Sequence, residues 1–351
     1  MTPRAFAAAA VLAIGILAAA CGGSSDPATP TPANSPTVAA TSTVAPAESP
    51  TPAATPATPA TSVTPAPPLA VPFDDASDPV AMLLSFYDAV NRHDYARAYR
   101  YLRTPAVTEA AFAAGYADTV SAFAILRPAS GIDAAAGNRR MVVAAVIDAV
   151  TANGSRQRFA GCYSTWRAAE GVSENPRDVL WHIEEAQIAP VAVTDPIPGL
   201  LDHACDAYAG RIANVGAPFA LRNSPLLATA AFFDAIRRAD FERARSYVVE
   251  GKRPPLADFR PAWANASKLT AVIGPVVTTA GAAGTVYARA LAVFVDDAGV
   301  ARFGMCVQLQ RSNMPANPGG DPRDNDWSLG STGLDPAAAT DPARALALAC
   351  H

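Results

Sequence analysis

The segment from Trp181 to Glu184 holds the side chains best suited to acid–base chemistry. Its alternation of apolar and polar residues is typical of a β-strand, in which residues two apart point to the same face. His182 and Glu184 are two apart. An imidazole beside a carboxylate can act as a general acid or base when both reach a pocket. We therefore take His182 and Glu184 as the candidate catalytic pair, although such a histidine is more often a surface or structural residue.

Other chemistries lack their motifs. The sequence contains no HExxH metal motif, no phosphate-binding glycine loop and no G-x-S-x-G nucleophile elbow. A net charge of −4 without any basic block argues against nucleic acid as a partner. We expect no cofactor and no metal.

The N-terminus has the features of an export signal. Arg4 precedes an apolar run over residues 5–20, which is short for a transmembrane helix and suits a signal peptide. The run ends Leu17-Ala-Ala-Ala-Cys21, which resembles the lipobox of bacterial lipoproteins. This resemblance implies that residues 1–20 are removed and that Cys21 is lipidated, which anchors the protein to the outer side of the bacterial cell membrane. A plain secretory signal followed by an accidental cysteine is the alternative.

A tether follows this signal over residues 21–72. It consists mainly of Ala, Thr, Ser and Pro, and it holds 13 of the 32 prolines of the chain. Such a composition cannot bury enough apolar surface to offset the entropy lost on ordering. We expect a disordered, extended segment that reaches on the order of 150 Å in polyproline II geometry.

The remainder of the chain contains one pattern twice. Residues 86–102 recur as residues 232–248, an offset of 146 (232 − 86), and eight of the seventeen positions are identical. Apolar residues in each copy recur at helical spacing, which predicts an amphipathic helix. Asp94 and Asp240 then predict the N-cap of a second, shorter helix.

Two strand-like stretches joined by a turn follow in each copy. In the first copy the turn contains Asn153-Gly154, which predicts a type I′ hairpin. Both return strands share the pattern Arg-Phe-x-x-Cys-x-x-x-x-Arg, and both copies then carry Pro-Arg-Asp-x-x-Trp, which ends at Trp181 and Trp327. Each tryptophan is expected to begin a last strand.

This order of elements resembles the NTF2-like superfamily of cone-shaped α+β domains. The phrase Phe-Tyr-x-Ala-x-Asn-x-x-Asp-Tyr-x-x-Ala-Tyr from residue 86 to 99 is similar to the first helices of its bacterial extracytoplasmic members. The resemblance implies two tandem domains, 73–215 and 216–351, each with N-terminal helices packed on a bent antiparallel sheet. Members of this superfamily bind ligands, act as enzymes, or do neither, so the fold does not choose among these functions.

Four cysteines remain after Cys21, and they occupy equivalent places in the two copies. Cys162 and Cys306 lie in the return strands, and Cys205 and Cys350 lie in the last helix of each copy. In an exported protein this repetition favours the pairs Cys162–Cys205 and Cys306–Cys350 among the three connectivities that four cysteines allow. A four-cysteine zinc site is the alternative, but it lacks any C-x-x-C pair.

Three classes of function stay open on this sequence. We favour a non-enzymatic binding or interaction module, whose partner is an envelope protein or a small apolar ligand. An isomerase, dehydratase or cyclase, which the resemblance allows, would need a histidine or carboxylate inside a cone, and only His182 and Glu184 offer this. A structural spacer is the third class. An empty apolar interior would favour the binding module. Ionisable groups that converge in one cone would favour the enzyme, and an interior filled by side chains would favour the spacer.

Overall fold

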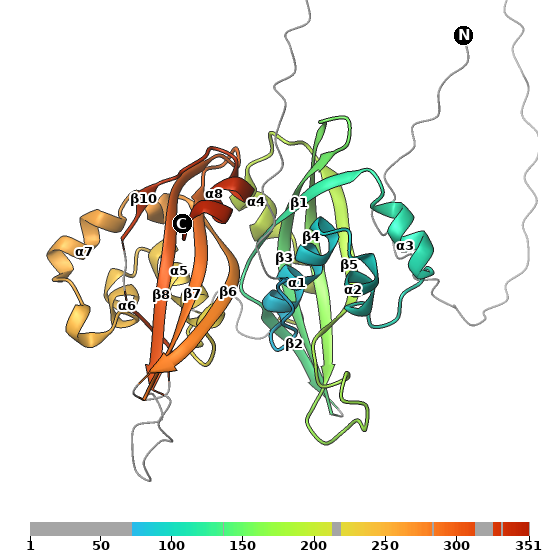
Figure 1. The fold of residues 1–351 in the computed structure, drawn as a ribbon, viewed down its shortest axis with the longest axis horizontal. Helices are drawn as coiled ribbons and strands as arrows, with labels where there is room; N and C mark the ends of the chain where they lie inside the picture. Colours follow the sequence, from blue (N-terminus) through green and yellow to red (C-terminus); the bar gives the residue numbers. More distant parts are fainter. Residues whose placement is uncertain are drawn as a thin grey trace, which may run out of the picture. The chain divides into compact units, whose positions relative to one another are not determined.

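The computed structural model describes residues 72–135, 137–212, 219–282, 284–312, 326–330 and 333–350. The expected signal peptide, Cys21, the tether up to residue 71 and the expected domain boundary at residues 215/216 lie outside these residues. Within them the chain forms two α+β units, each with helices that precede an antiparallel sheet (Figure 1). In the described part no helix has the length and the apolar composition needed to cross a membrane.

The first unit begins with three helices, continues with five strands and ends with one helix. Its elements are α1 (Pro79–Asn91), α2 (Tyr95–Arg100), α3 (Glu109–Gly115), β1 (Thr119–Leu126), β2 (Ser130–Ala135), β3 (Asn138–Thr151), β4 (Arg156–Ala168), β5 (His182–Val191) and α4 (Ile197–His203). A single 3₁₀ turn, Asp206–Tyr208, follows α4.

The second unit repeats this order. Its elements are α5 (Pro225–Arg237), α6 (Phe241–Ser246), α7 (Leu256–Trp263), β6 (Thr270–Ala282), β7 (Thr285–Val295), β8 (Ala301–Ser312), β9 (Ser328–Leu329), β10 (Asp335–Pro336) and α8 (Pro342–Leu348). Short 3₁₀ turns cover Glu250–Lys252 and Ala266–Lys268.

The two sheets share one strand order. In the first sheet β1 pairs with β3, β3 with β4, and β4 with β5, while β2 extends the pairing of β3. In the second sheet β6 pairs with β7, and β7 pairs with β8, as β1, β3 and β4 do in the first. Two short strands take the place of the long β5, because β9 pairs with β8 at Leu309 and β10 pairs with it at Gly304. The predicted repeat is therefore also a repeat of topology.

Short polar side chains cap the starts of the helices, including the two that the sequence predicts at Asp94 and Asp240. The carboxylate of Asp78 accepts hydrogen bonds from two amides at the start of α1, and the hydroxyl of Ser224 accepts one at the start of α5. Asp94 and Asp240 cap the short helices α2 and α6 in the same way. These side chains satisfy amides that lack partners within the helix, which is why they mark helix starts.

The turn between β3 and β4 and the turn between β7 and β8 have the same backbone geometry. This geometry differs from the type I′ turn that Asn153-Gly154 predicts. A type I′ turn needs a positive φ at both central residues. Among the described residues only Gly154 has a positive φ in the first turn, at 80°, and Gly299 has the same value in the second. In each turn the glycine amide donates to the carbonyl three residues earlier, Thr151 or Asp296. The Asn153-Gly154 pair therefore forms a longer turn than type I′, with one left-handed glycine.

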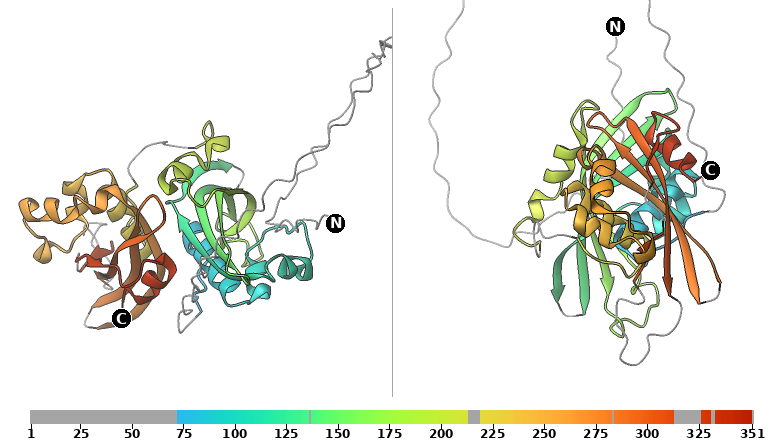
Figure 2. Two further views of the ribbon diagram at one scale, coloured as in Figure 1. Left: turned by 90° about the horizontal axis from the view of Figure 1, so that it is seen from above. Right: turned by 90° about the vertical axis from the view of Figure 1, so that its left-hand side faces the viewer.

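The strands of the first sheet are curved (Figure 2), and their pairing shifts register once between β1 and β3 and once between β4 and β5. On β5 the register shifts so that Thr165 pairs with Ile183 and Ser164 with Glu185, which leaves Glu184 without a position opposite it. An extra residue of this kind bends a strand and increases its twist. The sheet packs against α1 through apolar residues, among them Leu83, Phe86 and Val90, which are at most 3 % exposed.

Candidate functional site

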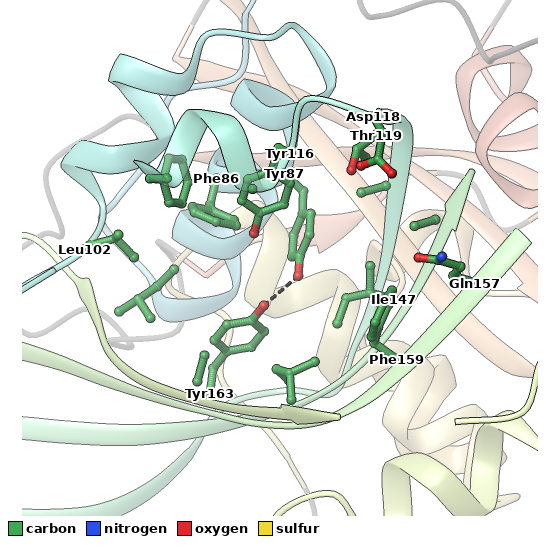
Figure 3. Close-up of a pocket in the computed structure, with 17 residues that line it drawn as sticks. Phe86, Tyr87, Leu102, Tyr116, Asp118, Thr119, Ile147, Gln157, Phe159 and Tyr163 are labelled. Atoms are coloured by element: carbon green, nitrogen blue, oxygen red, sulfur yellow. Dashed lines mark hydrogen bonds between the residues drawn. The ribbon is translucent and has the colours of Figure 1, made fainter. Parts of the chain in front are cut away.

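A pocket opens in the first unit between the N-terminal helices and the sheet (Figure 3). Its free volume is about 60 Å³, and 17 residues line it. One water needs about 10–15 Å³ in the same measure, and an engineered apolar cavity that holds benzene is about 150 Å³. The pocket therefore has room for several water molecules or for one end of a small organic molecule.

The walls of this pocket are mainly apolar. Phe86 on α1 and Phe112 on α3 form the helical side, where their rings lie 6.1 Å apart in an edge-to-face arrangement. Ile147 on β3, Phe159 on β4 and Ile188 on β5 form the sheet side. The sheet residues reach one face because alternate positions of neighbouring strands point the same way.

Two tyrosines from opposite walls meet inside the pocket. Tyr87 on α1 and Tyr163 on β4 are 6 % and 5 % exposed, and their hydroxyl oxygens are 2.5 Å apart (Figure 3). Burial raises the pKa of Tyr163 to about 12 and raises the pKa of Tyr87 further above its ordinary value. Burial also raises the pKa of the nearby Tyr116. All three phenols therefore stay protonated at neutral pH.

Polar residues of the pocket lie apart from this tyrosine pair. Asp118 and Thr119 come from the junction of α3 and β1, and Gln157 comes from the start of β4 (Figure 3). Asp118 is exposed and is the one carboxylate among the 17 lining residues, which include no histidine, lysine or arginine. We describe Asp118, Thr119 and Gln157 as the polar rim.

The second unit has aromatic rings without hydroxyl groups at the corresponding positions. The repeat places Phe233 where the first unit has Tyr87, and Trp263 where it has Tyr116. Phe233 packs edge-to-face on Phe294 at 5.0 Å, and Trp263 packs on Phe294 at 6.0 Å. Val307, which follows Cys306 as Tyr163 follows Cys162, is fully buried. The hydroxyl pair therefore belongs to the first unit and not to the shared scaffold.

The predicted dyad of His182 and Glu184 does not form in this pocket. Of the three residues 182–184, only Ile183 lines it. The Nε2 atom of His182 lies 2.8 Å from the carbonyl oxygen of Arg177, so this nitrogen carries the proton and donates it. Its Nδ1 is buried and has no hydrogen-bond partner in the part of the chain that the structure describes. His182 therefore holds the preceding loop to the start of β5.

Glu184 forms ion pairs instead of facing a histidine. Its carboxylate pairs with Arg103 and, at 2.9 Å, with Arg140. The guanidinium of Arg103 also lies 3.7 Å above the ring of Trp166. Glu184 occupies the extra position of the β-bulge. The alternation of apolar and polar residues in the sequence does not reveal such a bulge. Among the described residues, His182 and Glu184 therefore bond to different partners, and no hydrogen bond joins them.

Both expected disulfides are present. Cys162 on β4 bonds to Cys205 after α4, and Cys306 on β8 bonds to Cys350 after α8. The two bonds close loops of 43 and 44 residues. Disulfides of this kind are typical of an oxidising, extracytoplasmic compartment. Among the described residues no group of histidine, cysteine or acidic side chains has the arrangement of a metal site.

Comparison with known proteins identifies no relative. No family model matches the chain, and no curated protein and no solved structure matches it. Function is therefore inferred from the geometry of the chain itself.

The tyrosine pair was not among the residues predicted from the sequence. The signal lay in the comparison of the two copies, because Tyr87 and Tyr163 replace the apolar Phe233 and Val307 of the second copy. Each exchange alone is an ordinary variation of a core position. Only the fold shows that both added hydroxyls arrive at the same point.

Proposed function

We propose that the first unit binds a small, largely apolar molecule in the pocket that contains Tyr87 and Tyr163. The observation that carries this proposal is the contrast between the two units. The first has a cavity of about 60 Å³ with apolar walls, a polar rim and two hydroxyl groups inside, whereas the second packs the rings of Phe233, Trp263 and Phe294 on one another at the equivalent place. Concave apolar sites with a few polar groups are the usual form of small-molecule sites.

The composition of the pocket supports a binder over an enzyme. General acid–base catalysis needs a titratable group close to the reacting atoms, with a pKa near the working pH. The lining offers one exposed carboxylate, Asp118, and tyrosines whose pKa values burial raises. His182 and Glu184 form contacts outside the pocket.

The proposed setting of this binding site is the outer side of a bacterial membrane. In this proposal the two units are tandem NTF2-like domains, and Cys21 carries a lipid that holds them through the tether of residues 21–72. The two disulfides support an extracytoplasmic location. An apolar ligand fits this setting, because such molecules concentrate near membranes and need a protein site to cross the aqueous layer.

A cavity-filling substitution tests the binding function. Ala186 on β5 lines the pocket, so Ala186→Leu would place a larger side chain in the free space. Filling an existing cavity is usually neutral or stabilising by up to about 2 kcal/mol. Ala189 lies on the same strand, is exposed and does not line the pocket, so Ala189→Leu is the matched control.

Binding is measured on the full chain with a panel of small neutral fragments and ¹³C-labelled tyrosine rings as NMR reporters. We expect fragments that shift the Tyr87 and Tyr163 signals in the wild type and in Ala189→Leu, and at least a tenfold loss of affinity in Ala186→Leu. Equal binding in both variants, or no fragment that shifts these signals, would contradict the proposal.

A further inference from the structure

The hydroxyl groups of Tyr87 and Tyr163 offer one hydrogen bond more than the protein uses. Two phenols carry two O–H protons, and the bond between them uses one. Among the described residues neither hydroxyl has a second hydrogen-bond partner. Whichever tyrosine donates within the pair, the other keeps a proton without an acceptor in the protein.

A buried donor of this kind is unfavourable unless something accepts from it. Buried polar groups in proteins are normally satisfied by a protein group or by an ordered water. Here both tyrosines line a cavity of about 60 Å³, so an external acceptor has room to reach the remaining proton. The acceptor is therefore either water or an atom of a bound ligand.

The surroundings of the pair discriminate between kinds of acceptor. No lysine, arginine or histidine is among the lining residues, and the exposed carboxylate at the rim is negative. A ligand carboxylate at the tyrosine pair would lose its water without gaining a counter-charge, which is costly. A neutral oxygen avoids this cost, and the apolar walls suit a hydrocarbon body.

We propose that this pocket selects neutral, apolar molecules that carry a terminal hydrogen-bond acceptor oxygen, such as ketones, and that it rejects carboxylates. The second hydroxyl proton of the Tyr87–Tyr163 pair is donated to that oxygen. This inference rests on the proposed binding function and adds the chemical class of the ligand.

Three probes of nearly equal shape separate these possibilities. 2-Pentanone, 2-methyl-1-pentene and butanoate share a propyl group and differ in carrying a ketone, an alkene or a carboxylate at its end. Each is titrated into the full chain with ¹³C-labelled tyrosine rings as the NMR reporter. We expect 2-pentanone to bind at least about fivefold more tightly than 2-methyl-1-pentene, because the alkene displaces water and leaves the donor unpaired. Butanoate is expected to give no saturable shift.

Tyrosine-to-phenylalanine variants test the proton count. Tyr87→Phe and Tyr163→Phe each keep one hydroxyl, whose proton then has no partner, so both should retain the preference for the ketone. The double variant Tyr87→Phe/Tyr163→Phe should bind ketone and alkene equally. The second unit shows that the fold tolerates apolar residues at both places, Phe233 and Val307.

The outcomes separate this inference from the function on which it rests. Saturable binding of all three probes with similar affinity would overturn the ligand class while the binding function stands. No saturable shift with any probe would mean that the pair holds ordered water only, which overturns both. A ketone preference that survives in the double variant would also overturn the inference, because the donor would then lie elsewhere. Where the double variant does not fold, the probe series on the wild type and the single variants decides.

Discussion

Arg97 and Asp88 form a buried ion pair with a nitrogen–oxygen distance of 2.7 Å, and the second unit repeats it as Arg243 and Asp234 at 2.9 Å. In the first unit the same guanidinium donates to the carbonyl oxygen of Phe73, and the same carboxylate accepts from the amide of Phe73. The pair therefore ties the segment before α1 to both α1 and α2. We call this arrangement the arginine clamp.

Loss of one partner of the arginine clamp should be strongly destabilising. The side chain of Arg97 is 5 % exposed and that of Asp88 is 9 % exposed. Arg97→Met leaves the carboxylate with fewer partners in a buried place, which typically costs about 3–5 kcal/mol. Arg92→Ala removes the more exposed partner of the same carboxylate and should cost about 1 kcal/mol or less. Urea unfolding of both variants checks this, and equal losses would contradict the clamp.

Glycine should relieve strain in the turn between the first two helices of each unit. His93 and Ala239 have φ angles of 58° and 54°, in the left-handed region that disfavours residues with a Cβ. Ala239→Gly should therefore stabilise the protein by about 0.5–1 kcal/mol, after the entropy that glycine adds to the unfolded chain. Ala96→Gly, on the exposed side of α2, should instead cost about 1 kcal/mol. Thermal melting of the two variants should show shifts of opposite sign.

Each disulfide should contribute a similar free energy of folding. Loops of 43 and 44 residues correspond to roughly 4 kcal/mol in the chain-entropy model. We expect Cys162→Ala/Cys205→Ala and Cys306→Ala/Cys350→Ala to lower the unfolding free energy by comparable amounts near this value. Chemical unfolding under oxidising conditions measures both. In dithiothreitol the wild type should lose about the sum of the two, and an unchanged midpoint there would argue against a stabilising role.

The cap of α1 should make stability depend on pH. Burial raises the pKa of Asp78 to about 6, although hydrogen bonds from Val80 and Ala81 act in the opposite direction. Because the folded-state pKa lies above the unfolded value, this residue adds stability as the pH falls through about 6 toward 4. Asp78→Asn keeps an acceptor at the cap and does not titrate. The difference in unfolding free energy between wild type and variant should therefore change between pH 7.5 and pH 4.5 in favour of the wild type at the lower pH. A constant difference would contradict this.

Lipidation of Cys21 stays a prediction from the N-terminal sequence. Mass spectrometry of the protein from a native membrane fraction should show a mature chain that begins at residue 21 with an acylated cysteine. Cys21→Ser should appear unlipidated and should leave the membrane fraction. A wild-type chain that begins at another residue, or an unmodified Cys21, would refute the anchor.

Features that depend on nearby residues were predictable from the sequence. A cap such as Asp94 acts on amides within its own helix, so its identity and place suffice to predict the helix start. The disulfide pairs were also predictable, since two copies of one pattern reduce three connectivities to one. The repeat acted as an internal comparison and supplied long-range information that a single copy lacks.

Features that depend on where distant side chains converge were decided by the tertiary structure. The spacing of His182 and Glu184 predicted a shared strand face, but Glu184 occupies a bulge and pairs with arginines. Tyr87 and Tyr163 are 76 residues apart in the chain, and their hydroxyls meet because a helix and a strand are packed against each other. Neither hydroxyl carries a local signal, since a tyrosine in a helix or a strand packs as a phenylalanine does. Whether the space around the two hydroxyls stays open depends on the summed volume of all neighbouring side chains. Only the packed fold determines which side chains are neighbours.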